Sequence, residues 1–126
     1  EIDFGGSEPH HRWSAAGLYD NVNGTILIQN RANMGSGHGW SGANYVVWNC
    51  RGTLTCQKPP TAQNYAFGHV GKKEPGHFAR SPAAAKAHGI KDGYWESRGR
   101  RMIPDSLFVQ QFIDRLGVAK LGNLTD

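Results

Sequence analysis

The stretch YVVWNCR, residues 45–51, decides the fold because two similar stretches flank it in the sequence. TILIQNR begins at residue 25 and YAFGHVG at residue 65, so the three segments start at intervals of 20 residues. Each is rich in β-branched and aromatic residues and is bounded by Gly, Asn or Pro, which is typical of a β-strand. One strand per repeat of about 20 residues, with long glycine-rich turns, predicts the coils of a β-solenoid. The alternative is an ordinary antiparallel sheet, whose hairpins usually recur every ~8–12 residues.

Side-chain alternation along a strand assigns two faces to each segment. The mostly apolar set is predicted to face inward: Ile26, Ile28 and Asn30; Val46, Trp48 and Cys50; Ala66, Gly68 and Val70. The mixed and polar set is predicted to face outward: Leu27, Gln29 and Arg31; Val47, Asn49 and Arg51; Phe67, His69 and Gly71. We therefore expect an apolar interior and a solvated face that carries Arg, Asn and His.

The end of the chain differs from the repeats. In PDSLFVQQFIDRLG, residues 104–117, apolar residues recur at helical spacing, Asp105 or Ser106 can cap the first turn, and Gly117 ends the pattern. We expect coils over about residues 8–71, an excursion loop over about 72–103 with one short helix at PAAAKAHG, and a terminal helix over 105–117. This helix is expected to pack on the end or the side of the coils.

Length and charge restrict the class of protein. The 126 residues correspond to a single domain or to a piece of one, and the net charge of +4 suits an anionic partner. The sequence lacks RNP and zinc-finger patterns, so we expect no nucleic-acid partner. It also lacks a run of about 18 apolar residues, so we expect no membrane partner.

Cysteines and glycosylation motifs favour a secreted protein. Cys50 and Cys56 lie close enough in the sequence to close a small disulfide loop, or they are two buried free thiols. Asn23 and Asn123 begin N-x-[ST] motifs, which are glycosylation acceptors in a eukaryotic secretory pathway.

The loop NMGSGHGWSGAN, residues 33–44, is not a nucleotide-binding loop. Its G-x-G spacing is followed by a strand, whereas a dinucleotide site needs the N-terminus of a helix. No H-E-x-x-H or C-x-x-C spacing marks zinc, so no metal site is predicted, although histidines from separate coils remain an alternative. No cofactor is expected. Calcium binding is an alternative, although the sequence has no carboxylate cluster to hold the ion.

Arginine, histidine and aromatic side chains dominate the face that is expected to be solvated. Arginine pairs with carboxylate or sulfate and aromatic rings stack on sugars, so this set suits an acidic polysaccharide. The same groups can run a β-elimination on a uronic acid, in which a base removes the C5 proton and donors neutralise the carboxylate. The candidate catalytic residues are His11, Arg12 and His38. The candidate substrate-binding residues are His10, Arg31, Trp40, Asn49, Arg51 and His69.

Three longer stretches carry a resemblance to a known class. PHHRWSAAGLYDNV, IQNRANMGSGHGWSGANYVVWNC and WESRGRRMIPDSLFVQQFIDRLG resemble the C-terminal part of secreted right-handed parallel β-helix proteins of the pectate-lyase-like class. The similarity covers about residues 8–71 and 93–117. It implies an all-β right-handed parallel β-helix and polysaccharide lyase or glycosidase activity in a groove along the coils. Members of this class that use calcium hold it on aspartates, which are not clustered here.

The sequence favours a secreted enzyme, most simply a polysaccharide lyase that cleaves a uronate-containing glycan by β-elimination. One alternative is a glycoside hydrolase of the same fold whose carboxylates lie on preceding coils. The other is a non-catalytic β-helix protein that binds glycans or a cell wall. Because the class has more coils than this chain, we expect an N-terminal chain of the same precursor to complete the β-helix.

Overall fold

The computed structural model describes residues 5–12 and 14–124, apart from the side chain of Asn123. In chain order the strands and helices are β1 (Leu18–Asp20), β2 (Asn23–Asn30), β3 (Trp40–Ser41), β4 (Val46–Trp48), β5 (Arg51–Lys58), β6 (Tyr65–Phe67), β7 (Val70–Lys73), α1 (Pro82–Ala87), β8 (Lys91–Asp92), β9 (Tyr94–Glu96), α2 (Leu107–Leu116) and the 3-10 helix η1 (Val118–Leu124). None of the described helices is long and apolar enough to cross a bilayer.

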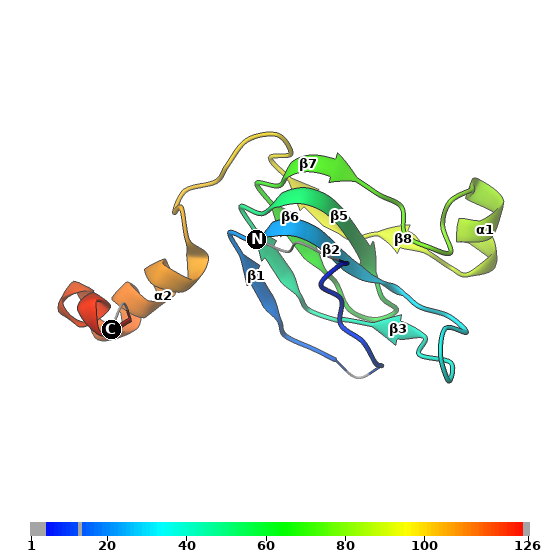
Figure 1. The fold of residues 1–126 in the computed structure, drawn as a ribbon, viewed down its shortest axis with the longest axis horizontal. Coiled ribbons are helices and arrows are strands. Elements are labelled where there is room, and N and C mark those ends of the chain that lie inside the picture. The colour runs from blue at the N-terminus through cyan, green and yellow to red at the C-terminus, as the bar shows by residue number, and fades with distance from the viewer. Residues whose placement is uncertain (1–4, 13, 125–126) are drawn as a thin grey trace.

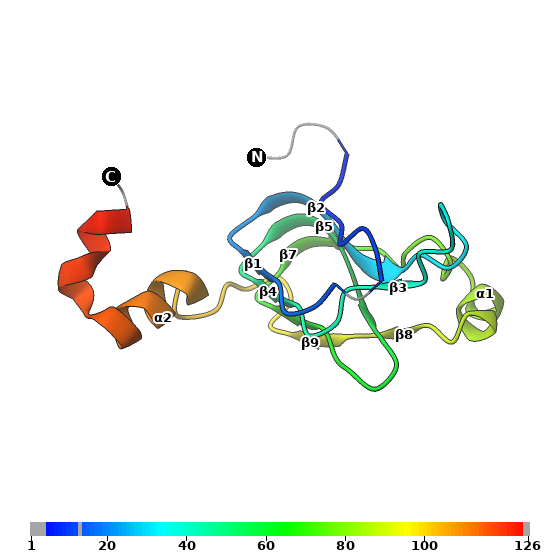
Figure 2. The same ribbon diagram turned by 90° about the horizontal axis from the view of Figure 1, so that it is seen from below.

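The strands form two sheets, which lie one above the other (Figures 1 and 2). The first sheet has the order β1-β4-β6-β9, and all its strands are parallel. The second has the order β3-β2-β5-β7, with parallel pairing among β2, β5 and β7. Strand β3 runs antiparallel to β2, and β8 runs antiparallel to β5. The apolar residues between the two sheets form the core.

The prediction of an all-β right-handed parallel β-helix is wrong. The molecule is a small mixed α/β domain with 19% helix and 33% strand, and neither sheet is closed. A solenoid repeats the same connection at each level, whereas the connections here differ in content. After β2 the chain turns back as β3, and between β7 and β9 it forms α1 and β8. These departures make the second sheet mixed and add helix outside the sheets.

The predicted period of 20 residues is also wrong. Leu18 is in register with Val46, Val46 with Tyr65, and Tyr65 with Tyr94, so the spacing varies from pair to pair. The segment 25–31 pairs with β5, where Ile26 is opposite Leu54, and not with residues 45–48. Segments of similar composition therefore belong to different sheets.

The predicted faces fail where the chain passes from one sheet to the other. Asn21, Asn49 and Gly68 have positive φ values of 59°, 51° and 68°, and each lies between a strand of the first sheet and one of the second. This bend interrupts the alternation on which the assignment depends. The buried apolar core consists of Ile26, Ile28, Val47, Cys50, Leu54, Cys56 and Ala66. Val47 was expected to face outward, as were four buried polar residues, Gln29, Arg31, Asn49 and His69.

The two predicted helices form. Ser81 caps α1 and Ser106 caps α2 through side-chain oxygens, and α2 ends at Gly117. The expectation that α2 packs on the end or side of the strands is wrong, because α2 buries none of its residues and extends away from the sheets (Figure 1). The region 72–103 was expected to be a loop, but it also contributes strands β8 and β9.

Candidate functional site

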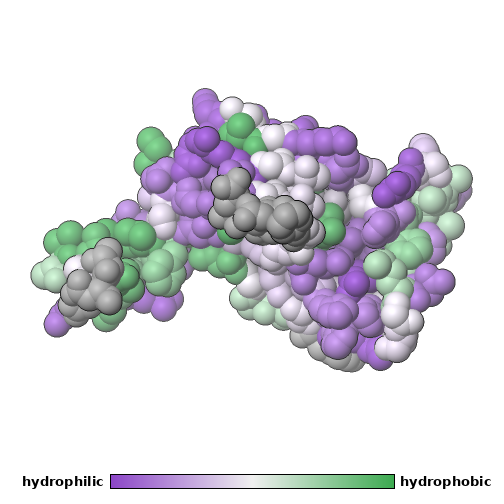
Figure 3. All heavy atoms as spheres, viewed as in Figure 1, coloured by the Kyte–Doolittle hydropathy of each residue, from purple (hydrophilic) through white to green (hydrophobic). Residues whose placement is uncertain are grey.

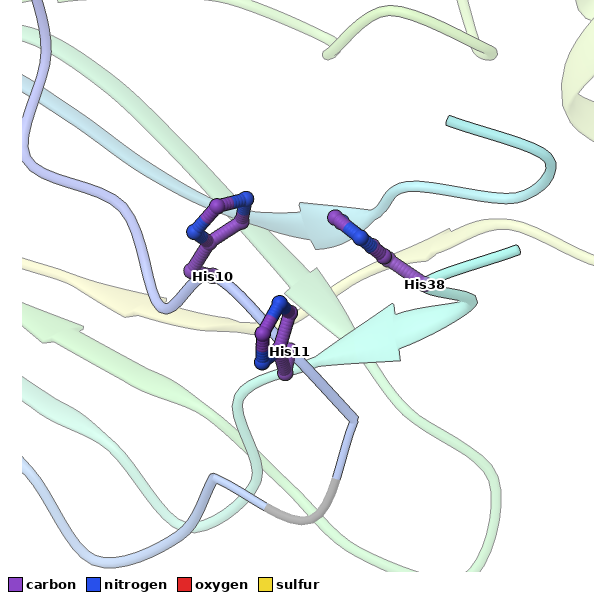
Figure 4. Close-up of side chains that lie close together, drawn as sticks. All are labelled: His10, His11 and His38. Atoms are coloured by element: carbon purple, nitrogen blue, oxygen red, sulfur yellow. The ribbon is translucent and has the colours of Figure 1, made fainter. Parts of the chain in front are cut away.

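Three histidines from two distant segments form a cluster, which we call the histidine cluster (His10, His11 and His38). The ring centroids of His10 and His11 are 4.5 Å apart, those of His10 and His38 are 4.8 Å apart, and those of His11 and His38 are 4.7 Å apart. One nitrogen from each ring lies within 4.8 Å of the others. Figure 4 shows the three rings around a common space, with His10 and His11 on the N-terminal segment and His38 on the loop before β3. His10 and His11 are exposed and His38 is buried.

The glycine-rich loop between β2 and β3 positions His38. Backbone bonds from Arg31 N to the Gly39 oxygen and from Gly39 N to the Ala32 oxygen close the loop at its base. Gly35 has a φ of +56°, and a Cβ atom there would lie 2.5 Å from Nε2 of His38. Glycine at 35 therefore allows both the turn and the close approach of the imidazole to the backbone.

Arg31 joins the two segments of the cluster. Its Nη1 donates to the backbone oxygen of His10 and to Nδ1 of His38, the latter at 2.9 Å. Its Nε lies 3.3 Å from Oε1 of Glu8, which also accepts a bond from Nε2 of Gln29 at 2.7 Å. The buried guanidinium thus has an anionic partner and fixes the position of both histidine-bearing segments.

The contact with Arg31 sets the protonation of His38. A guanidinium has only donors, so Nδ1 of His38 accepts and the proton of the neutral ring is on Nε2. Burial lowers the pKa of His38 below 6.5, and the charge of Arg31 lowers this pKa further. The ring is therefore neutral at neutral pH.

Two pockets meet at the histidine cluster. The larger, of about 530 Å³, is mostly apolar and is lined by Trp40, Pro59 and Pro60 among others, with Arg12 and His38 at its border. The smaller, of about 270 Å³, is lined by His11, Arg12, Ser36 and His38. Arg12 and His38 line both pockets, and Nη1 of Arg12 is held by the backbone oxygen of Gly37. A ligand with an apolar face and a polar or charged edge fits this combination.

Six of the predicted site residues are brought together, namely His10, His11, Arg12, Arg31, His38 and Trp40. Asn49, Arg51 and His69 lie elsewhere, at or just before the starts of β5 and β7. Arg51 pairs with Asn23, the first residue of β2, whereas Arg31 directly follows the last residue of β2. The length of β2, about 25 Å, therefore separates Arg51 from Arg31.

Two of these three distant residues have structural partners. Nδ2 of Asn49 donates to the backbone oxygens of Met102 and Asp105, at 3.0 and 2.8 Å, and its Oδ1 accepts from Met102 N. His69 is 1% exposed, and its Nε2 donates to the Gly52 oxygen at 3.1 Å. Arg51 is exposed at the edge of this region.

The sequence did not reveal several residues that shape the site. Glu8 and Gln29 act on Arg31 across the fold, and nothing local in their sequence context indicates this role. Pro59 and Pro60 stand out in the sequence, but their dipeptide reads as a turn and not as the wall of a pocket.

The remaining predicted positions lie away from the cluster. Asn23 is exposed at the start of β2, while the side chain of Asn123 lies outside the described part of the chain. Cys50 and Cys56 are free thiols buried in the core. Burial raises the pKa of both thiols, that of Cys56 to about 12.

The described residues hold one group of three or more His, Cys, Asp or Glu side chains close enough to bind a metal ion, the histidine cluster. Its donor atoms are all imidazole nitrogens, a set that suits zinc or copper and not calcium. Together with the two pockets, the cluster is the candidate site. Comparison with protein-family models, with curated proteins and with solved structures finds no match to this chain.

Proposed function

We propose that this chain binds an acidic, uronate-containing glycan beside the histidine cluster and cleaves it by β-elimination. One observation supports this proposal above the others. The two pockets share Arg12 and His38, so a cation and an imidazole border an apolar surface on which a sugar ring can lie. Trp40 lines this surface together with Pro59 and Pro60.

Each part of the site has a separate task in binding. The apolar walls of the larger pocket suit the non-polar face of a sugar ring. Arg12 is exposed and is fixed through only one of its nitrogens, so the rest of its guanidinium can pair with a uronate carboxylate. Pairing of that carboxylate with a cation also stabilises the negative charge that develops on it during the reaction.

The imidazoles supply the proton transfers. His11 lines the smaller pocket with Arg12 and accepts the C5 proton of the uronate. The electron pair of the C5–H bond forms a C4–C5 double bond as the C4–O4 bond breaks. The departing O4 takes up the proton that His11 has accepted, and it also accepts a hydrogen bond from Nε2 of His38, the nitrogen that carries hydrogen because Nδ1 accepts from Arg31.

Elimination is favoured over hydrolysis by the groups that line the pockets. A glycosidase needs two carboxylates on either side of the bond. Neither of the two pockets is lined by Asp or Glu within the described part of the chain, and nearby Glu8 is engaged by Arg31 and Gln29. The site therefore has bases and cations but lacks a carboxylate pair.

The test is incubation with a panel of uronate polymers, with two readouts on the same sample. Elimination produces an unsaturated uronate that absorbs in the ultraviolet, whereas hydrolysis produces reducing ends without this absorbance. We expect both signals to rise together, and to fall at least about 100-fold in His11→Ala, since a positioned general base contributes about 10²–10⁴-fold. His77→Ala, at another exposed histidine, is the matched control and should retain activity.

Reducing ends without ultraviolet absorbance would overturn elimination in favour of hydrolysis. Binding of a polymer without either signal would show a non-catalytic glycan-binding protein. Failure of every polymer to bind would overturn the whole proposal.

A further inference from the structure

We propose that the histidine cluster also binds one divalent transition-metal ion, such as Zn²⁺, and that the ion inhibits the enzyme by occupying imidazoles needed for proton transfer. The metal site stands on the geometry of the three rings alone. The inhibition rests on the function proposed above.

The three imidazoles provide the right number and kind of ligands. Zinc is commonly held by three protein nitrogens, with the fourth position left for water or substrate. One nitrogen from each of His10, His11 and His38 lies within 4.8 Å of the others. Nitrogens at ~2.0–2.1 Å from zinc in a tetrahedron are about 3.4 Å apart, so binding requires the rings to draw together.

The rings are able to move in this way. His10 and His11 are exposed, and rotation about their side-chain bonds displaces the ring nitrogens by more than the required distance. His38 and His11 line the pocket of about 270 Å³, which leaves room for the ion, for a fourth ligand and for access from solvent.

Arg31 must release one contact for the ion to bind. A neutral imidazole has one lone pair, and that of His38 is engaged by Nη1 of Arg31. The guanidinium keeps two partners after this release, because Nη1 also donates to the His10 oxygen and Nε lies beside Glu8. Glu8 offsets the positive charge of Arg31 beside the ion.

The donor set determines which ions bind. Imidazole suits Zn²⁺, Cu²⁺ and Ni²⁺, whereas Ca²⁺ and Mg²⁺ require oxygen ligands. The described residues that line the smaller pocket offer no carboxylate. We therefore expect calcium and magnesium to have no effect at this site.

The metal site is tested by calorimetric titration of the full, untagged chain with ZnCl₂, and by visible absorption after addition of Co²⁺. We expect one Zn²⁺ per chain and the intense bands of tetrahedral cobalt. His10→Ala and His11→Ala should each weaken Zn²⁺ binding by at least about 10- to 100-fold. Loss of a residue that only supports a metal ligand already has an effect of this size, and these histidines are ligands themselves. His77→Ala and His88→Ala, which alter exposed histidines outside the cluster, should bind as the parent does.

The outcomes separate the site from the inhibition. Absence of Zn²⁺ binding, or equal binding by folded His10→Ala, His11→Ala and parent, overturns the metal site. If Zn²⁺ binds but the rate of uronate-polymer cleavage stays the same, with and without a chelator, the inhibition alone is overturned. If the metal-free chain cleaves no polymer while the two variants lose Zn²⁺, the proposed function fails and the metal site stands.

Discussion

Arg31 illustrates how single residues define this site. Its side chain was expected on a solvated face, but it is 8% exposed and links Glu8, the backbone of His10 and the ring of His38. Sequence could identify Arg31 as one of a group of candidate cations. It could not identify its task, since its partners come from segments up to 23 positions away that only the fold brings together.

His69 makes a testable prediction about pH and stability. Burial lowers its pKa below 6.5, the nearby charge of Arg98 lowers it further, and the bond to the Gly52 oxygen opposes this shift. As the pH falls through 6.5, His69 is therefore protonated in the unfolded chain but stays neutral in the folded chain. The contribution of neutral His69 to the free energy of unfolding is complete above pH 6.5, and it decreases as the pH falls towards the pKa of His69 in the folded chain.

We expect the free energy of unfolding in urea to fall between pH 7 and pH 5, and to fall less in His69→Gln. Glutamine keeps a donor for the Gly52 oxygen but does not titrate. The other ring packed against His69 is that of Trp95, which does not titrate either. An identical pH dependence in the parent and the variant would contradict this role for His69.

At the scale of the elements, a column of three glycines lets the strands of the second sheet stack. Gly24 is in register with Gly52, and Gly52 with Gly71, where β2, β5 and β7 begin. A Cβ atom on Gly52 would lie 2.3 Å from the Gly24 oxygen, and one on Gly71 would lie 2.1 Å from the Gly52 oxygen. These contacts are with backbone, which cannot move aside without breaking the ladder.

Gly52→Ala should therefore lower the free energy of unfolding more than Gly99→Ala does. Both glycines have positive φ, of 103° and 82°, but a Cβ atom on Gly99 would have nothing within 4 Å. We expect the control to cost about 1–2 kcal/mol from backbone strain. Gly52→Ala should cost roughly 1–3 kcal/mol more because of the clash. Equal losses in urea unfolding would show that the close stacking is unimportant.

Helix α2 is attached to the strands through its first turn. Oδ2 of Asp20 accepts bonds from Oγ of Ser106 and from N of Phe108, each at 2.7 Å. Asp20→Ala should lose about 1 kcal/mol of local stability, as for loss of a helix cap, and speed amide hydrogen exchange at residues 108–110 several-fold. Asp114→Ala is the control, because Asp114 lies on the same helix and accepts a bond from Gln110, which is also in α2. Equal acceleration in both variants would refute the attachment.

The elements differed in how far sequence could predict them. The helical spacing and the caps in residues 104–117 were sufficient to locate α2, because helix periodicity and capping are local signals, and the short helix expected at PAAAKAHG forms as α1. Pairing is not local, so TILIQNR was matched with the wrong partner. The bends at Asn21 and Asn49 carry no signal in hydrophobicity, although asparagine tolerates positive φ better than most residues.

For the whole molecule, α2 and β3, the strand that follows the loop with His38, lie at opposite ends of the structure (Figure 1). Apolar side chains remain exposed on and around α2, including Phe108, Leu116 and Val118 at 50%, 59% and 68%, and hydrophobic atoms gather there in the space-filling view (Figure 3). The sequence predicted strands and a terminal helix, and six of its candidate residues lie together in the candidate site. It did not predict that the second sheet is mixed, since the turn-back at β3 and the insertion of α1 and β8 depend on contacts across the fold.

Binding of an acidic glycan at the histidine cluster and the apolar pocket underlies both the proposed cleavage and its inhibition by metal. The most direct measurement is titration of the protein with a uronate oligosaccharide, followed by NMR of the imidazole and indole nitrogens. We expect saturable shifts for His10, His11, His38 and Trp40, with the signals of His69 and His88 unchanged. Shifts confined to His69, or no shift at any of these rings with excess oligosaccharide, would contradict binding at this site.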